Sequence, residues 1–335
     1  MSTVTLGEGN TPLVESVQIG PSLGLRRLLF KLESCNPTGS YKDRFVAEEV
    51  ARLLKVGARA CVATSSGNTG SSLAAYCTRY GIKCAIVVNT SAPAGKLMQM
   101  QAHGAYLLRV RGFVADPRVT QQVFHDLHRF AIERGAPLVV SAYRHCPVGM
   151  RGVEAIGHEL QSHAAHVFVP VGGGGLYTAV AKSVQPGVRV HAVQPARCST
   201  VVASFLRGDS DIHPVNSTTR ISGLAVPFDI DASLALQHLR ANGGQGWAVD
   251  DEEVFEMHHR MLAEEGLYCE PAGAAALAGL RKAVERGALR RDEPIVCLVT
   301  GHGFKDPESI GQVANQYPDR TVEPGYVVNA LLEMM

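Results

Sequence analysis

The chain has 335 residues, of which 46% are hydrophobic and 19% are charged, and its formal net charge is +1. This length allows two packed units or one large α/β body. Without a basic excess, nucleic acid is not expected as a partner. No apolar run reaches the roughly 18 residues that a membrane span needs, and the first ten residues lack the pattern of a signal peptide. We therefore expect a cytoplasmic protein that binds no membrane.

The eight cysteines include no C-x-x-C pair, and several of them lie in apolar, strand-like runs. A chain of this size folds without disulfides, so we expect reduced, buried thiols. The 13 histidines show no spacing typical of metal ligands. Neither residue type predicts a metal site.

Short apolar runs alternate with helical patterns through the first half of the chain. The expected strands span 60–63, 84–88, 105–110 and 137–141, and the expected helices span 70–80, 96–103 and 117–133. Gly81, Gly104 and Gly135 follow these helices, where a positive φ angle ends a helix.

The second half repeats the alternation, with strands expected at 167–171, 189–193 and 295–300 and helices at 177–184, 250–265 and 272–286. Asp250 and Glu253 form the pattern of a capping box. The stretch 198–244 is the least regular. Continuous apolar strands between helices predict an α/β fold with mainly parallel sheets flanked by helices.

The segment Asn36–Arg44 contains the first candidate catalytic residue, Lys42. Pro37 and Gly39 keep its start out of a helix, and a helix is expected to begin near Lys42. The positive potential at a helix start favours a neutral amine, which a lysine needs to form a Schiff base or to accept a proton. Taken alone, a lysine in this position is far more often a solvated residue in a turn.

A hydroxyl-rich turn, Ser65-Ser66-Gly67-Asn68-Thr69-Gly70, connects an expected strand to an expected helix. Hydroxyls and backbone N–H groups at a helix start can bind a carboxylate. The alternative is an ordinary capped turn.

Four consecutive glycines, Gly172, Gly173, Gly174 and Gly175, lie between another strand and helix. Such a loop can close around a phosphate at the positive end of the helix. The pattern is not a P-loop. A nicotinamide site is disfavoured because the next strand ends in Gln194-Pro195, without the acidic residue that binds ribose.

Two further polar residues lie at the ends of apolar segments. Thr300 ends the last expected strand, at a sheet edge where ligands bind. Glu270 precedes the Ala-rich helix, and its carboxylate could either cap that helix or belong to a site.

Together these stretches resemble the fold-type II enzymes that use pyridoxal 5'-phosphate (PLP), the tryptophan synthase β-like group. Within that group the chain is most similar to threonine synthase, on the basis of Asn36–Arg44 and the run from Thr300 to Pro307. The resemblance extends from Gly9 to Pro307. It implies two α/β domains, a smaller one at 45–142 and a larger PLP-binding one at 1–44 plus 143–320, followed by a tail at 321–335.

The resemblance also implies residue roles. Lys42 would hold PLP as a Schiff base and act as acid and base, Asn68 would bind the ring oxygen of PLP, and Thr300 would bind its pyridine nitrogen. The residues implied to hold the PLP phosphate are Gly172, Gly173, Gly174, Gly175 and Leu176. Those implied to bind the substrate carboxylate are Ser65, Ser66, Gly67 and Thr69. A homodimer is implied by analogy alone.

Two stretches depart from the threonine synthase pattern. The segment from Ser141 to Gly152 lacks the Asn-Pro of the family's substrate-phosphate site, although Arg144 and Arg151 could still bind an anion. The segment Ile221–Pro227 is more similar to threonine and serine dehydratases. We therefore expect a PLP-dependent lyase acting on a small amino acid, with conversion of O-phosphohomoserine to threonine as the first named reaction. The alternatives are a threonine or serine dehydratase, a β/γ-replacement enzyme for an unusual amino acid, and a non-catalytic PLP-binding protein.

Overall fold

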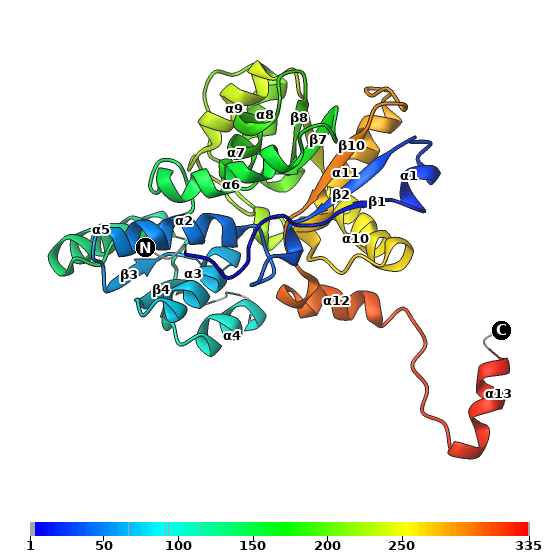
Figure 1. The fold of residues 1–335 in the computed structure, drawn as a ribbon, viewed down its shortest axis with the longest axis horizontal. Helices are drawn as coiled ribbons and strands as arrows, with labels where there is room; N and C mark the ends of the chain where they lie inside the picture. Colours follow the sequence, from blue (N-terminus) through cyan, green and yellow to red (C-terminus); the bar gives the residue numbers. More distant parts are fainter. Residues whose placement is uncertain (1–3, 66, 91, 93, 115, 334–335) are drawn as a thin grey trace.

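The computed structural model describes residues 4–65, 67–90, 92, 94–114 and 116–333. Within these residues, no helix combines the length and the apolar character that crossing a membrane requires. The chain forms two sheets, each covered by helices (Figure 1).

The smaller sheet has four parallel strands in the order β5-β4-β3-β6. Its strands are β3 (Ala60–Ala63), β4 (Lys83–Asn89), β5 (Tyr106–Val110) and β6 (Leu138–Val139). The helices of this part are α2 (Lys42–Lys55), α3 (Asn68–Arg79), α4 (Ala94–Ala102) and α5 (Pro117–Arg134). Each crossover between strands contains a helix, as parallel pairing requires.

The larger sheet has six strands in the order β1-β2-β10-β7-β8-β9, and only the β1–β2 pair is antiparallel. Its strands are β1 (Leu13–Glu15), β2 (Leu28–Leu32), β7 (His166–Pro170), β8 (Arg189–Pro195), β9 (Gly246–Val249) and β10 (Ile295–Val299). The helices around it are α1 (Ile19–Ser22), α6 (Pro147–Glu159), α7 (Gly175–Ser183), α8 (Val201–Arg207), α9 (Ala232–Ala241), α10 (Asp251–Glu265) and α11 (Pro271–Glu285).

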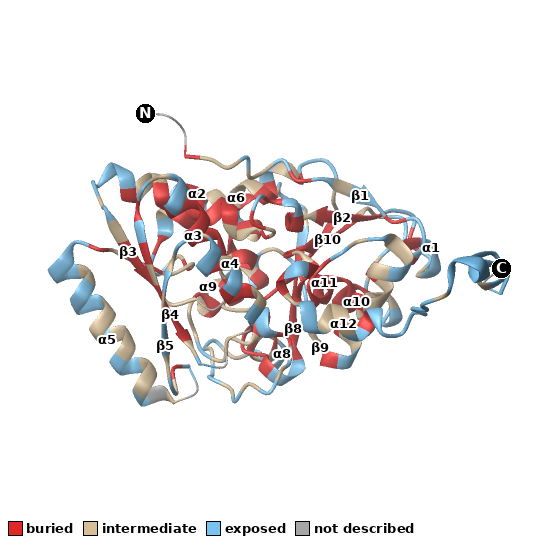
Figure 2. Ribbon diagram, turned by 90° about the horizontal axis from the view of Figure 1, so that it is seen from below, coloured by how far each residue is buried: buried red, intermediate tan, exposed pale blue. Residues whose placement is uncertain are grey.

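Small side chains allow the helices to pack closely on the larger sheet. Helix α11 is buried along most of its length (Figure 2). A Cβ atom on Gly279 would lie 2.4 Å from Val193 of β8, so the helix approaches the strand more closely than any larger residue would allow. The Ala-rich composition of this helix therefore follows from its position in the core.

The expected α/β fold with two mainly parallel sheets is confirmed. The capping box at Asp250 is also present, with the N–H of Asp250 donating to the Glu253 carboxylate at 2.7 Å. The expected strand 137–141 is shorter, because only Leu138–Val139 pairs with β3. The irregular stretch 198–244 contains α8 and α9, which the sequence patterns did not predict.

The chain ends in two short helices, α12 (Pro307–Ala314) and α13 (Val327–Leu332). Helix α13 buries none of its residues and projects away from the body (Figure 1). The weak sequence signals after Pro307 suggest a tail that lies along another subunit, and this stays a prediction.

Candidate active site

A cavity of about 320 Å³ opens where the carboxyl ends of strands from both sheets meet. The chain segments that follow β3, β6, β7 and β10 all line it. Ligands commonly bind at this edge of parallel sheets. Of the residues predicted for the site, Lys42, Ser65, Gly67, Asn68, Thr69, Gly172, Gly173, Gly174, Gly175, Leu176 and Thr300 line the cavity. Ser66 lies outside the described residues.

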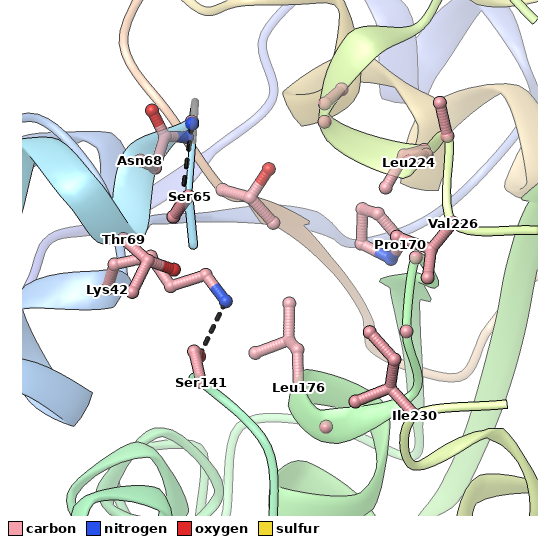
Figure 3. A pocket seen from close by; sticks show the side chains of 18 of the residues that line it. Lys42, Ser65, Asn68, Thr69, Ser141, Pro170, Leu176, Leu224, Val226 and Ile230 are labelled. Carbon is pink, nitrogen blue, oxygen red and sulfur yellow. Dashed lines mark hydrogen bonds between the residues drawn. The ribbon is translucent and has the colours of Figure 1, made fainter. Parts of the chain in front are cut away.

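Lys42 is the first residue of α2, and its side chain points into the cavity (Figure 3). Its Nζ atom donates to Oγ of Ser141, 2.8 Å away. The turn before Lys42 is tied to the end of β10, since the N–H of Tyr41 donates to the carbonyl of Thr300 at 3.2 Å. The N–H of His302 also donates to the carbonyl of Gly39 at 2.9 Å. These backbone contacts place Lys42 and Thr300 on the same cavity.

The two residues that follow Lys42, Asp43 and Arg44, are buried and fix the backbone at this position. Asp43 accepts from the N–H of Thr38 at 2.7 Å and from its hydroxyl at 2.6 Å. Burial raises the pKa of Asp43, although these hydrogen bonds oppose the shift. Arg44 contacts Glu33 at 2.7 Å and Glu159 at 2.6 Å. The backbone around Lys42 is therefore fixed by contacts on both sides.

The hydroxyl-rich turn leads directly into α3, which begins at Asn68. Oγ of Ser65 accepts from the N–H groups of Gly67 and Gly70, each at 3.3 Å. Because the first N–H groups of a helix have no partner within it, this turn retains donors for an anion such as a substrate carboxylate.

The glycine loop packs closely against the chain segment behind it. Gly174 adopts a φ angle of +98°, directly before α7. A Cβ atom at this position would lie 2.6 Å from the carbonyl oxygen of Asp231, so no larger residue fits. The unpaired N–H groups at the start of α7 are suitable donors for the phosphate of PLP. The residues present therefore fit that group.

Glu270, which sequence analysis left between a capping and a site role, faces the cavity. It occupies the N-cap position of α11 but makes no side-chain capping bond. Its carboxylate instead accepts from Nδ2 of Asn68 at 2.7 Å and contacts Nζ of Lys96 at 3.0 Å. The capping interpretation is therefore wrong.

The two arginines considered for substrate binding lie elsewhere. The guanidinium of Arg144 is exposed and pairs with Asp229 at 3.4 Å. Arg151 is exposed on α6. Neither residue lines the cavity.

Three polar residues near the site escaped sequence reasoning. Ser141 and Lys96 line the cavity, and Asp231 lies behind the glycine loop. Asp231 accepts from the N–H of Tyr143 at 2.7 Å, and burial raises its pKa. These residues lie at the ends of different elements and meet only after folding, so no local motif marks them.

The cysteines lie outside the cavity lining. All eight are free thiols, and seven of them are buried. Cys61, Cys77 and Cys84 bring their sulfur atoms within 4.8 Å of one another in the core of the smaller sheet. None of the three lines the cavity.

Comparisons with known proteins identify relatives that match nearly the whole chain. Threonine synthase of Methanocaldococcus jannaschii is 33% identical over 322 residues, which cover 91% of this chain and 77% of that protein. Threonine synthase of Mycobacterium tuberculosis is 31% identical over 336 residues, which cover 98% of this chain and 91% of that protein.

Solved structures share the fold at lower identity. Maize serine racemase matches with a TM-score of 0.77 and 22% identity, covering 92% of each chain. Threonine deaminase isoform 2 from Solanum lycopersicum matches with a TM-score of 0.77 and 21% identity, covering 92% of this chain and 84% of that one.

The family model described as pyridoxal-phosphate dependent enzyme matches residues 4–301, a range that includes every strand of the two sheets and the residues that line the cavity. The chain therefore belongs to the family of pyridoxal-phosphate dependent enzymes.

Proposed function

We propose that this PLP-dependent lyase removes the hydroxyl group of a small, uncharged amino acid of the serine and threonine type, which yields a 2-oxo acid and ammonia. One observation carries this choice. Within the described residues, the cations that line the cavity are Lys42 and Lys96, and Lys96 is paired with Glu270. A substrate that carries a phosphate of its own, in addition to that of PLP, would find no unpaired cation there. Burying such an unpaired charge is costly.

The wall opposite Lys42 supports the same choice. In Figure 3, Leu176, Val226 and Ile230 lie on the side of the cavity that faces the polar residues of α2 and α3. These apolar side chains exclude water from the cavity and offer no hydrogen-bond partner to a substrate phosphate.

The residues of the site have distinct roles in this proposal. PLP, when bound, supplies the electron sink that weakens the bonds at the substrate Cα. Lys42 would hold PLP covalently and then accept the Cα proton at Nζ, while Ser141 orients this amine. Ser65, Gly67 and Thr69 would bind the substrate carboxylate, and Thr300 would offer a neutral hydroxyl to the pyridine nitrogen.

Asn68 and the glycine loop would complete the cofactor site. The second N–H of the Asn68 amide would face the ring oxygen of PLP. The loop from Gly172 to Gly175, with the N–H of Leu176, would bind its phosphate at the positive end of α7.

Conversion of O-phosphohomoserine to threonine is the second candidate. The relatives named threonine synthase, which match more than nine-tenths of this chain, favour it. Arg144 would then have to leave Asp229, and its 58% exposed side chain would have to turn towards the cavity.

Purified enzyme tested separately with L-serine, L-threonine and O-phospho-L-homoserine distinguishes the two candidates. Formation of a 2-oxo acid from serine or threonine supports the first, and release of inorganic phosphate supports the second. In the second case Arg144→Met should raise KM for the phosphorylated substrate. If none of the three reacts, both named reactions are wrong while the family assignment stands.

We further propose a cytoplasmic homodimer, on the basis of the family resemblance alone. Light scattering on the purified protein tests the dimer. A mass near 35.8 kDa at micromolar concentration would contradict it.

A further inference from the structure

A charged pair lies buried beside the cavity. The side chains of Lys96 and Glu270 are each 3% exposed, and Nζ lies 3.0 Å from Oε2. The other carboxylate oxygen of Glu270 accepts from Nδ2 of Asn68 at 2.7 Å. A carboxylate only accepts hydrogen bonds, so this contact determines which end of the Asn68 amide carries the N–H groups.

This chain of contacts joins the two halves of the molecule. Lys96 and Asn68 belong to α4 and α3 around the smaller sheet, whereas Glu270 precedes α11 of the larger one. Gly301 packs against the carboxylate so closely that a Cβ atom there would lie 2.3 Å from Oε1 of Glu270. Glu270 therefore has little freedom to move.

The contact with Glu270 places the Asn68 amide at the wall of the cavity. Its Oδ1 atom is buried and has no hydrogen-bond partner within the described residues. One of its two N–H groups is taken by Glu270, and the other is available to a ligand. Desolvating two charges and a carbonyl oxygen costs free energy, and apolar residues would fill this space at less cost.

We propose that Glu270, held by Lys96, is a positioning residue for the cofactor. It orients the Asn68 amide so that the free N–H faces the ring oxygen of PLP. The charges of Glu270 and Lys96 together set the proton affinity of the nitrogen that links Lys42 to PLP. This inference rests on the cofactor placement given under the proposed function.

The signs of the two charges predict opposite effects on that nitrogen, which is cationic when protonated. Removing the negative charge of Glu270 leaves Lys96 unbalanced and disfavours the protonated form. Removing Lys96 leaves Glu270 unbalanced and favours it. A purely structural role for the pair gives no reason for opposite signs.

Other titratable groups surround Glu270 and remain in every variant. They are Lys305 of the 3₁₀ turn η4 (Gly303–Lys305), Asp43 beyond it, and His258 of α10. Burial lowers the pKa of Lys305 to about 8, so titrations are interpreted as differences from the wild type at each pH.

The test titrates the PLP absorption band of the holoenzyme with pH in the wild type, Glu270→Gln, Lys96→Met and the double variant. We expect the midpoint to fall by on the order of one pH unit in Glu270→Gln and to rise by a similar amount in Lys96→Met. The double variant should return close to the wild-type midpoint. Lys182→Met, which removes a partly exposed pair with Glu154 at 2.6 Å, is the matched control and should leave the midpoint unchanged.

Midpoints that stay unchanged, or that move in the same direction in both single variants, would overturn the inference while leaving PLP binding intact. Failure of the wild type to bind PLP would overturn the proposed function and this inference together. If Lys96→Met does not fold, Glu270→Asp replaces it. Aspartate keeps the negative charge, but its shorter side chain no longer reaches the Asn68 amide. Glu270→Asp should therefore weaken PLP binding severalfold, and an unchanged PLP affinity would count against the inference.

Discussion

Nζ of Lys42 donates to Oγ of Ser141 across the cavity at 2.8 Å, although the two residues are 99 positions apart in the sequence. Lys42 begins α2, and Ser141 follows the short strand β6. The amine of Lys42 is therefore oriented by a residue from a different element.

Replacing Ser141 by Ala should slow turnover by about tenfold, which corresponds to roughly 1.4 kcal/mol, the contribution of one hydrogen bond. Ser141→Thr keeps the hydroxyl and should retain most of the activity. The measurement is kcat with the substrate identified by the three assays above. Equal kcat values for Ser141→Ala and the wild type would show that this contact does not orient Lys42 during the reaction.

The glycine loop allows a test of cofactor binding with a closely matched control. Gly174 and Gly187 both have positive φ angles, of +98° and +93°. A Cβ atom would collide with Asp231 at the first position and would meet nothing within 4 Å at the second.

Gly187→Ala should lose about 1 kcal/mol of stability from backbone strain alone, and Gly174→Ala should lose more because its Cβ atom also collides with Asp231. Only Gly174→Ala should also weaken PLP affinity, by tenfold or more, as measured by titrating the apoenzyme with PLP. Similar PLP affinities in the two variants would refute the assignment of the loop to the phosphate.

The buried ion pairs behind Lys42 predict a large effect on stability. The side chains of Arg44 and Glu33 are 3% and 1% exposed, and hydrogen bonds from Arg44 and Lys31 outweigh burial and lower the pKa of Glu159 to about 2. Arg44→Met would leave two acidic groups without this partner and should lower the free energy of unfolding by about 3–5 kcal/mol.

The control for this variant is Arg118→Met. The side chain of Arg118 is 92% exposed in its pair with Asp116, so its removal should change stability by less than about 0.5 kcal/mol. Urea unfolding at pH 7 measures both variants. Equal losses of stability would mean that burial does not govern the contribution of these pairs.

A buried histidine pair predicts acid sensitivity. Nδ1 of His191 accepts from the N–H of Gln245 at 3.2 Å, so the proton of its neutral ring lies on Nε2 and is donated to Nδ1 of His166 at 2.9 Å. His166 in turn donates from Nε2 to Glu293 at 2.7 Å. Burial, together with the nearby His166, lowers the pKa of His191 to about 3.

Since the folded state holds this ring neutral, its contribution to stability is present above the ordinary pKa of about 6.5 and is lost as the pH falls towards 3. We expect a loss of about 2 kcal/mol between pH 7 and pH 5. Urea unfolding at both pH values should show a smaller loss in His191→Gln than in the wild type and in the exposed His163→Gln. Equal losses in all three proteins would contradict this assignment.

Sequence patterns predicted the alternating strands and helices because periodicity and glycine stops are local signals. Lys42, the glycine loop and Thr300 could be found because each lies in a continuous motif beside an element end. Ser141 and Lys96 could not, because a serine after a two-residue strand and a lysine in a helix have no distinctive local pattern. Glu270 could be noticed but not assigned, since its partners Asn68 and Lys96 are distant in sequence.

The most direct test of the whole account is to find which lysine holds PLP. Borohydride reduction of the holoenzyme, followed by peptide mass spectrometry, locates the modified residue. We predict modification of Lys42, with loss of the absorption band both on reduction and in Lys42→Ala. Modification of another lysine, such as Lys96, which also lines the cavity, or a band that persists in Lys42→Ala, would contradict the account.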